Sequence, residues 1–185
     1  MESNKKSKSE QQIEDQPYFR SLLTMKILLP INNIGKHIKQ NLEKKISSLI
    51  EGRCTVEGYI KPDSVRIQNY SSGKVNCEYV EYICSYECWV CYPVENMKVE
   101  CTCKTITKAG IHGEVIDKKG NIPIVIFVAR DHHLMNSTYE NVRENTKMIV
   151  SIIGVRFELN DDHVSAIGKI IDIVSEKPSL QIFED

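Results

Sequence analysis

The pattern of apolar and polar positions predicts a strand followed by an amphipathic helix near the start of the chain. Residues 18–30 are apolar enough for a strand that ends at Pro30. The next segment carries an apolar stripe at helical spacing, with lysines on its other faces. The stripe consists of Ile34, Ile38, Leu42, Ile46 and Leu49. We expect Asn32 or Asn33 to cap this helix and Gly52 to end it.

Short strands are predicted after the helix, around residues 54–56, 64–70 and 75–89. Turns at Glu57–Gly58, "KPDS" and "SSG" separate them. The strand "YICSYECWV" carries large residues on both faces and is therefore expected to be buried on both sides. Pro93 and Asn96 mark a boundary. We predict a small α+β domain over residues 19–96, preceded by a disordered polar tail over residues 1–18.

The second half of the chain is predicted to consist mainly of strands, the first of which, "KVECTCKTITKAG", alternates between apolar and polar residues. Strands are expected over residues 98–110, 111–117, 122–130, 146–161 and 163–173. A longer irregular excursion, 132–145, separates the third strand from the fourth. Five short antiparallel strands with this spacing describe an OB-fold β-barrel, which we place over residues 97–175, with a polar tail over residues 176–185. The predicted fold class is α+β.

Composition narrows the functional classes. The net charge of −1 provides no overall attraction to nucleic acid, so any such role needs a local basic patch. No apolar run reaches the ~20 residues that span a bilayer. The N-terminal segment is rich in Lys and Ser and lacks the apolar core of a secretory signal. We therefore expect an intracellular protein in a reducing compartment.

The seven cysteines raise the question of a zinc site. Cys88 and Cys91 form a C-x2-C pair beside Cys84, and Cys101 and Cys103 form a C-x-C pair. Both clusters lie in strand-like stretches, and no tight glycine turn joins the paired cysteines. In a strand, residues 101 and 103 share one face, as small buried hydrophobic residues would. We predict no metal or cofactor, although the sequence leaves zinc binding by this cluster open.

The segment "FVARDHHL" invites an enzymatic interpretation through Asp131, His132 and His133. Adjacent histidines on a strand point to opposite faces, so both could bind one ion only beyond the strand's end. The chain also lacks an H-E-x-x-H helix, a glycine-rich phosphate loop and a nucleophile elbow. We expect Asp131 to begin a turn and accept backbone hydrogen bonds, with the two histidines exposed. The sequence predicts no enzyme.

Several segments in series resemble one known family. They run "LLPINNIGKHIKQNLEKKI", "EGRCTVEGYI", "YVEYICSYECWVCYPVENMKVECTC", "ITKAGI", "PIVIFVARDH" and "HVSAIGKI". In order and spacing they resemble the large stalk subunit of multisubunit DNA-directed RNA polymerase, which archaea possess and which is the seventh subunit of eukaryotic RNA polymerase II. The resemblance covers Leu22 to Ile173. The composition, rich in Ile and Lys, fits a version carried by a large DNA virus.

The resemblance implies a ribonucleoprotein-like N-terminal domain followed by an OB domain. It implies a non-catalytic subunit that pairs with a small helical stalk partner and docks on the polymerase core near the clamp. The OB domain would contact nascent single-stranded RNA during initiation and elongation. The expected location is with the transcription machinery, in the nucleus, the cytoplasm, a viral factory or the virion. The alternative is a free-standing OB-fold RNA-binding protein of translation or RNA metabolism.

Two sets of residues are candidates for these contacts. The RNA-binding set contains Lys104, Lys108, His112, Lys118, Lys119, Arg130, His132 and His133. The polymerase-docking set contains Gly58, Tyr59, Ile60, Lys61 and Arg66. A solvated lysine face is the alternative for the first set, and core packing is the alternative for Tyr59 and Ile60. Phe127 is expected in the core, which leaves the barrel with few aromatic stacking surfaces.

Overall fold

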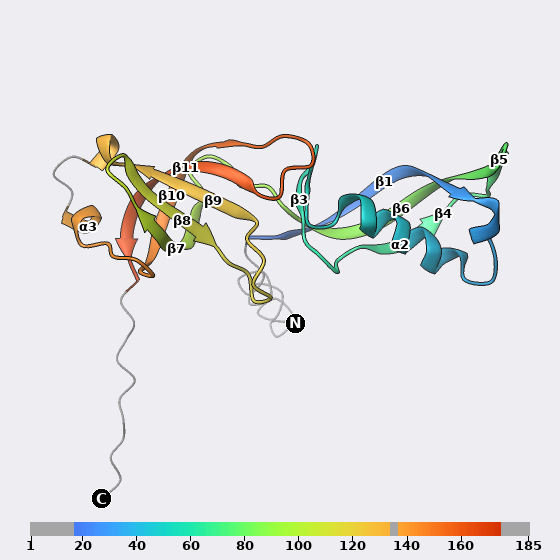
Figure 1. Ribbon diagram of the computed structural model, residues 1–185, viewed down its shortest axis with the longest axis horizontal. Coiled ribbons are helices and arrows are strands. Elements are labelled where there is room, and N and C mark those ends of the chain that lie inside the picture. The colour runs from blue at the N-terminus through green and yellow to red at the C-terminus, as the bar shows by residue number, and fades with distance from the viewer. Residues whose placement is uncertain (1–16, 134–136, 175–185) are drawn as a thin grey trace, which may run out of the picture. The chain divides into compact units, whose positions relative to one another are not determined.

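The computed structural model describes residues 17–133 and 137–174, and the chain forms two compact units (Figure 1). The N-terminal unit comprises residues up to Pro93 together with Arg156–Val164. The second unit comprises Val94–Val155 and the residues from Ser165 onward. Each unit has its own fold and is described separately below.

The N-terminal unit is built on one long antiparallel strand pair. Strand β1 (Phe19–Pro30) pairs along its whole length with β6 (Tyr79–Cys91). The other edge of β6 is shared by three short strands, β3 (Gly58–Ile60), β4 (Arg66–Tyr70) and β5 (Lys74–Asn76). Strand β2 (Cys54–Thr55) pairs with β3. The predicted strand 75–89 is divided by a turn at Cys77, which has a positive φ of 54°.

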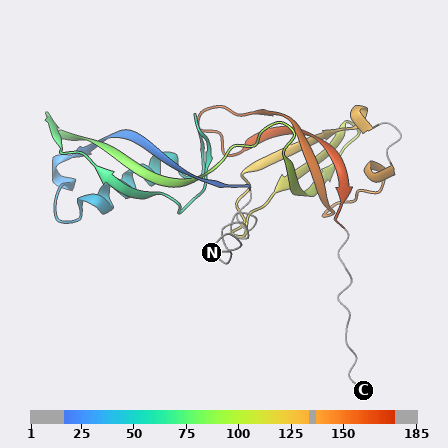
Figure 2. The same cartoon turned by 180° about the vertical axis from the view of Figure 1, so that it is seen from behind.

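Helix α2 (Ile38–Ile50) covers one face of this sheet, as Figure 1 and, from behind, Figure 2 show. Its buried residues Leu42, Ile46 and Ile50 recur every four positions and pack into the core. Alternation along β6 sends Tyr82, Cys84, Tyr86 and Cys88 into the same core. One face of β6 is thus core, as expected, whereas Ile83 on the opposite face is 52% exposed, so burial of that face against a partner stays a prediction.

The helix was correctly predicted, but its ends differ from the prediction. It begins at Ile38, with His37 as the N-cap and no side-chain cap. Residues Ile31–Asn33 instead form the 3-10 helix η1, and Ile34 is extended, so the asparagines do not cap α2. At the other end Leu49 is exposed and Ile50 is buried in its place. Gly52 takes a positive φ of 71° beyond the helix, as a glycine at a helix end can do easily.

A carboxylate at the end of α2 holds the loop that follows β3. Glu51 Oε1 accepts hydrogen bonds from the backbone N–H groups of Ser64 (2.9 Å) and Val65 (2.8 Å). Its Oε2 accepts a third from Asp63 (3.1 Å), which has a positive φ of 58°. Three donors that would otherwise need water are satisfied by one side chain. This contact connects the helix directly to the start of β4.

The second unit contains a closed five-stranded barrel. Its strands are β7 (Lys98–Ile106), β8 (Gly110–Val115), β9 (Ile124–Ala129), β10 (Lys147–Arg156) and β11 (Val164–Ile173). The order around the barrel is β7-β8-β9-β11-β10, and β10 pairs with β7 to close it. All five predicted strands are present, and this order is consistent with an OB-fold barrel.

The barrel interior is filled by side chains that alternate along the strands. Ile124, Ile126 and Val128 of β9 are fully buried, and Met148, Val150 and Ile152 of β10 are buried with them. Gly168 of β11 fits tightly, since a Cβ there would overlap the side chain of Val150. The connection from β9 to β10 contains the 3-10 helix η2 (Arg130–His133) and the short helix α3 (Ser137–Glu140).

The segment that joins β10 to β11 packs within the N-terminal unit. Asp161 C=O accepts a hydrogen bond from Cys54 N–H (2.7 Å), and Asn160 N–H donates to Cys54 C=O (2.9 Å). The rings of Tyr92 and Phe157 meet edge to face, with centroids 5.6 Å apart. In chain order these residues fall inside the predicted OB domain. The boundary predicted from Pro93 and Asn96 therefore has an exception, residues 156–164, which only long-range contacts reveal.

Candidate nucleic-acid interface

An aromatic pair lies on the outer face of the barrel. His112 of β8 and Phe127 of β9 are cross-strand partners, with ring centroids 4.9 Å apart and an interplanar angle of 47°. His112 is exposed and Phe127 is half-buried. The prediction that Phe127 belongs to the core was wrong, because Ile126 and Val128 on either side of it point inward. That alternation was readable in the sequence and was the signal that could have found this pair.

Two lysines lie near this pair, one beside it in β7 and one in the turn before β8. Lys104 lies at a β-bulge in β7, one residue before the Thr105 that pairs with His112. Its Nζ is 3.7 Å from Glu114 Oε2, and its side chain is 56% exposed. Lys108 is exposed in the turn between β7 and β8. An aromatic surface beside mobile positive charge is the arrangement with which OB barrels bind single strands.

Arg130 lies beside the start of β8, and Lys118 and Lys119 lie in the turn after its other end. Arg130 N–H donates to Ala109 C=O (3.0 Å), which places it at the start of that strand. Lys118 and Lys119 are exposed in the turn beyond its other end, where Asp117 Oδ1 accepts the N–H of Lys119 (2.8 Å). A strand of this length spans roughly 17–20 Å. The structure therefore places Lys108 and Arg130 at the start of β8, Lys104 beside His112, and Lys118 and Lys119 beyond the other end of the strand.

The two adjacent histidines have different environments. His132 is exposed, as predicted, whereas His133 is only 4% exposed and the prediction of an exposed pair was wrong. His133 Nε2 accepts the backbone N–H of Ile170 (3.0 Å), so its ring proton is on Nδ1 and is donated to Ala129 C=O (2.8 Å). Both ring nitrogens are thus used to tie η2 to β9 and β11. His133 is a structural residue and contributes no exposed RNA contact.

The cysteines are mostly buried thiols. Cys54, Cys84, Cys88, Cys91, Cys101 and Cys103 are buried, and Cys77 is exposed. Burial raises the pKa of the Cys88 thiol to about 11 and that of Cys101 to about 12. Cys101 and Cys103 lie on one face of β7, as predicted. Among the described residues, no three His, Cys, Asp or Glu side chains gather where they could hold a metal ion.

Comparison with known proteins identifies a viral relative. A protein of Acanthamoeba polyphaga mimivirus, provisionally named a DNA-directed RNA polymerase subunit, is 25% identical to this chain over 176 residues. The match covers 85% of this chain and 84% of the relative. Because this share is larger than either compact unit, the match extends over both units. No family model matches the chain. The chain is thus similar to a viral protein with that name over most of the length of both.

The predicted docking residues divide into buried and exposed members. Tyr59 and Ile60 are buried, 4% and 0% exposed, which favours core packing for them. Gly58 has a φ of 119°, and a Cβ there would lie 2.6 Å from Cys91 C=O, so the backbone that approaches it is the chain's own β6. Lys61 Nζ lies 4.7 Å above the ring of Tyr18, and exposed Arg66 lies 3.8 Å from Glu43. A docking role for this set stays a prediction.

Within the described residues, no helix is both long and apolar enough to cross a membrane.

Proposed function

We propose that this protein is a non-catalytic, stalk-type subunit of a DNA-directed RNA polymerase. The observation that carries the proposal is the similarity to the mimivirus protein of that name over most of both chains. The barrel strand order supports it, because an OB barrel after an α+β unit is what the resemblance to the stalk subunit implies. In this role the chain works inside the cell with the transcription machinery, and the catalytic residues belong to other subunits.

Docking would use the face of the N-terminal sheet opposite α2. Leu22 and Leu28 of β1 and Ile83 of β6 are 66%, 45% and 52% exposed on that face. The ion pairs Arg20–Glu87 and Lys26–Glu81 lie among them. Protein interfaces have an apolar centre and a polar rim, and exposed Leu and Ile side chains on a sheet face can supply such a centre. The small helical partner and the polymerase core are the proposed occupants, with Lys61 and Arg66 as further contacts.

RNA contact would use the outer face of the barrel. A base stacked on Phe127 and His112 would lie beside Lys104 and Lys108, whose charges attract the phosphate backbone. Only a few such groups are available, so the contact would be weak, salt-sensitive and without strong sequence preference. The same aromatic pair also supports the second candidate, a free-standing OB-fold RNA-binding protein of translation or RNA metabolism, which requires exposed aromatic surface.

Recovery from the native source separates the two candidates. A tagged chain captured at moderate salt is expected to bring the large catalytic polymerase subunits and one small helical protein in near-equal amounts. Leu22→Asp should remove most of these proteins, since it places a charge in the proposed docking face. Val56→Asp is the matched control, because Val56 is 81% exposed in the turn between β2 and β3. Capture of the chain alone, or with assorted RNA, would favour the free-standing protein.

RNA contact is tested separately by Phe127→Ala. Loss of one stacking surface is worth about 1–3 kcal/mol per base, so the Kd for an eight-nucleotide single-stranded RNA should rise roughly tenfold. Fluorescence anisotropy at two salt concentrations measures this change. Tyr79→Ala is the control, because Tyr79 is 46% exposed in the N-terminal unit. Equal Kd values for Phe127→Ala and the unaltered chain would show that RNA does not use this face.

A further inference from the structure

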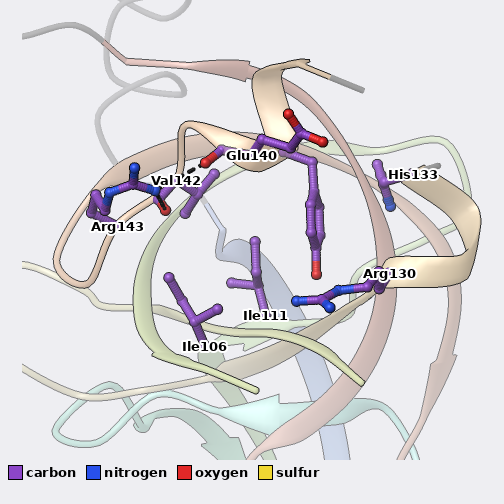
Figure 3. A pocket seen from close by; sticks show the side chains of 8 residues that line it. Ile106, Ile111, Arg130, His133, Glu140, Val142 and Arg143 are labelled. Atoms are coloured by element: carbon purple, nitrogen blue, oxygen red, sulfur yellow. Dashed lines mark hydrogen bonds between the residues drawn. The ribbon is translucent and has the colours of Figure 1, made fainter. Parts of the chain in front are cut away.

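The second unit contains a cavity that the outer-face RNA contact does not use. It has a volume of about 450 Å³ and lies among the ends of β7 and β8, η2 and α3 (Figure 3). Ile106, Ile111 and Val142 form its apolar wall. Arg130 and Arg143 line it from opposite sides in Figure 3, and Tyr139 and His133 also line it. An apolar cavity of this size with a few polar groups is typical of a small-molecule site.

Tyr139 is the polar group in this cavity that lacks a partner. The residue is 8% exposed, and its Oη is buried with no hydrogen-bond partner among the described residues. Its ring stacks on His133, with centroids 5.2 Å apart and an interplanar angle of 18°. His133 cannot supply the partner, since both of its nitrogens bond to backbone groups. A buried hydroxyl without a partner destabilises the fold by about 1–3 kcal/mol unless something binds it.

The charges around the cavity favour an anion. Arg130 is exposed and forms no ion pair with any described residue, and Figure 3 shows its guanidinium pointing inward beside Ile111. Arg143 Nη1 donates to the carbonyl oxygens of Glu140 (2.9 Å) and Val142 (3.0 Å), which fixes its guanidinium at the other side. Exposed Glu140 supplies one negative charge against these two. The balance around the cavity is therefore positive.

We propose that this cavity binds a nucleoside phosphate. The phosphate would accept hydrogen bonds from the Arg130 guanidinium and from Tyr139 Oη, a geometry for which a planar guanidinium is suited. The base would pack against Ile106, which is 38% exposed and which a small inorganic anion would leave in contact with water. Ile111 and Val142 are already buried and form the wall behind it. The ligand is either a free nucleotide or the phosphorylated terminal nucleotide of an RNA. The proposal stands on the cavity alone and does not require membership of a polymerase.

Calorimetric titration of the purified full chain tests the proposal and identifies the source of the phosphate. The ligands are uridine monophosphate, uridine, inorganic phosphate, and an RNA trinucleotide with either a 5′-phosphate or a 5′-hydroxyl. The nucleotide should bind at least tenfold more tightly than uridine and than inorganic phosphate, as expected when charged hydrogen bonds and an apolar surface both contribute. Tighter binding of the 5′-phosphorylated trinucleotide than of the nucleotide indicates an RNA end, and the reverse indicates a free nucleotide. Equal binding of phosphorylated and unphosphorylated ligands overturns the proposal.

Two variants locate the binding in the cavity. Tyr139→Phe should raise the Kd for uridine monophosphate roughly tenfold while leaving the Tm unchanged or higher, because it removes only a hydroxyl without a partner. Arg130→Gln should weaken binding by at least as much. Lys118→Gln, at the other end of β8, is the matched control. A lower Tm for Tyr139→Phe with unchanged affinity would refute the assignment. Phe127→Ala should leave the Kd for uridine monophosphate unchanged. The cavity proposal and the proposed RNA contact on the outer face can therefore fail independently.

Discussion

His133→Ala is expected to destabilise the second unit by about 3 kcal/mol. The substitution removes one partner each from Ala129 C=O and Ile170 N–H, and an unpaired buried polar group costs about 1–3 kcal/mol. It also removes the ring that stacks on Tyr139, a contact worth about 0.5–1.5 kcal/mol. The measurement is urea-induced unfolding, monitored through a spectroscopic signal that arises from the second unit.

Two further variants separate the contributions of His133. His133→Phe keeps an aromatic ring against Tyr139 and loses both hydrogen bonds, so it should retain most of the destabilisation. His132→Ala changes the exposed neighbour and should alter stability by less than about 0.5 kcal/mol. If His133→Ala and His132→Ala unfold at the same urea concentration, the two hydrogen bonds of His133 contribute nothing net and water replaces them. A destabilisation of about 3 kcal/mol by His133→Ala would also indicate that His133 and η2 hold Tyr139 and Arg130 in place.

Glu51→Ala is expected to destabilise the N-terminal unit by about 2–3 kcal/mol. Its carboxylate accepts the backbone N–H groups of Asp63, Ser64 and Val65, and hydrogen bonds to a charged group are worth about 1.5–3 kcal/mol each. The loop is partly exposed, so water recovers part of the sum. Hydrogen exchange should show the loss of protection concentrated at residues 63–65.

Two control substitutions test whether the effect of Glu51→Ala depends on the negative charge of the side chain and on its position in the loop contact. Glu51→Gln keeps one carbonyl acceptor and should lose less stability than Glu51→Ala, since neutral hydrogen bonds are weaker than charged ones. Glu57→Ala removes an exposed carboxylate in the same unit and should leave the unfolding free energy nearly unchanged. Equal stability of Glu51→Ala and Glu57→Ala would mean that the loop is held by its apolar contacts, chiefly through fully buried Val65.

The loop held by Glu51 bears on the proposed docking function. Lys61 and Arg66 flank it, and both are proposed contacts with the polymerase core. If Glu51→Ala unfolds only this loop, capture of polymerase subunits should fall even though the exposed face of β1 and β6 is intact. A loss of capture with Leu22→Asp and none with Glu51→Ala would restrict the docking surface to the sheet.

The sequence by itself determined the elements whose patterns are local. The stripe at residues 38, 42 and 46 specified α2, although it extended in error to residue 34, and apolar runs between turn signals specified β1 and the five barrel strands. Alternation in β9 also indicated that Phe127 points outward, although we had predicted that this residue lies in the core. These signals repeat every two or about four residues, so a short stretch of chain is enough to show them.

Only the tertiary structure decided the contacts that join distant residues. His133 is buried and accepts a hydrogen bond from Ile170, which lies 37 positions away. Tyr139, in an irregular excursion, is a buried ring that stacks on that histidine. Glu51 holds a loop 12 to 14 positions away, and Cys54 pairs with the segment around Asp161. No periodic pattern encodes such partners, because each depends on where the backbone returns after the fold has formed.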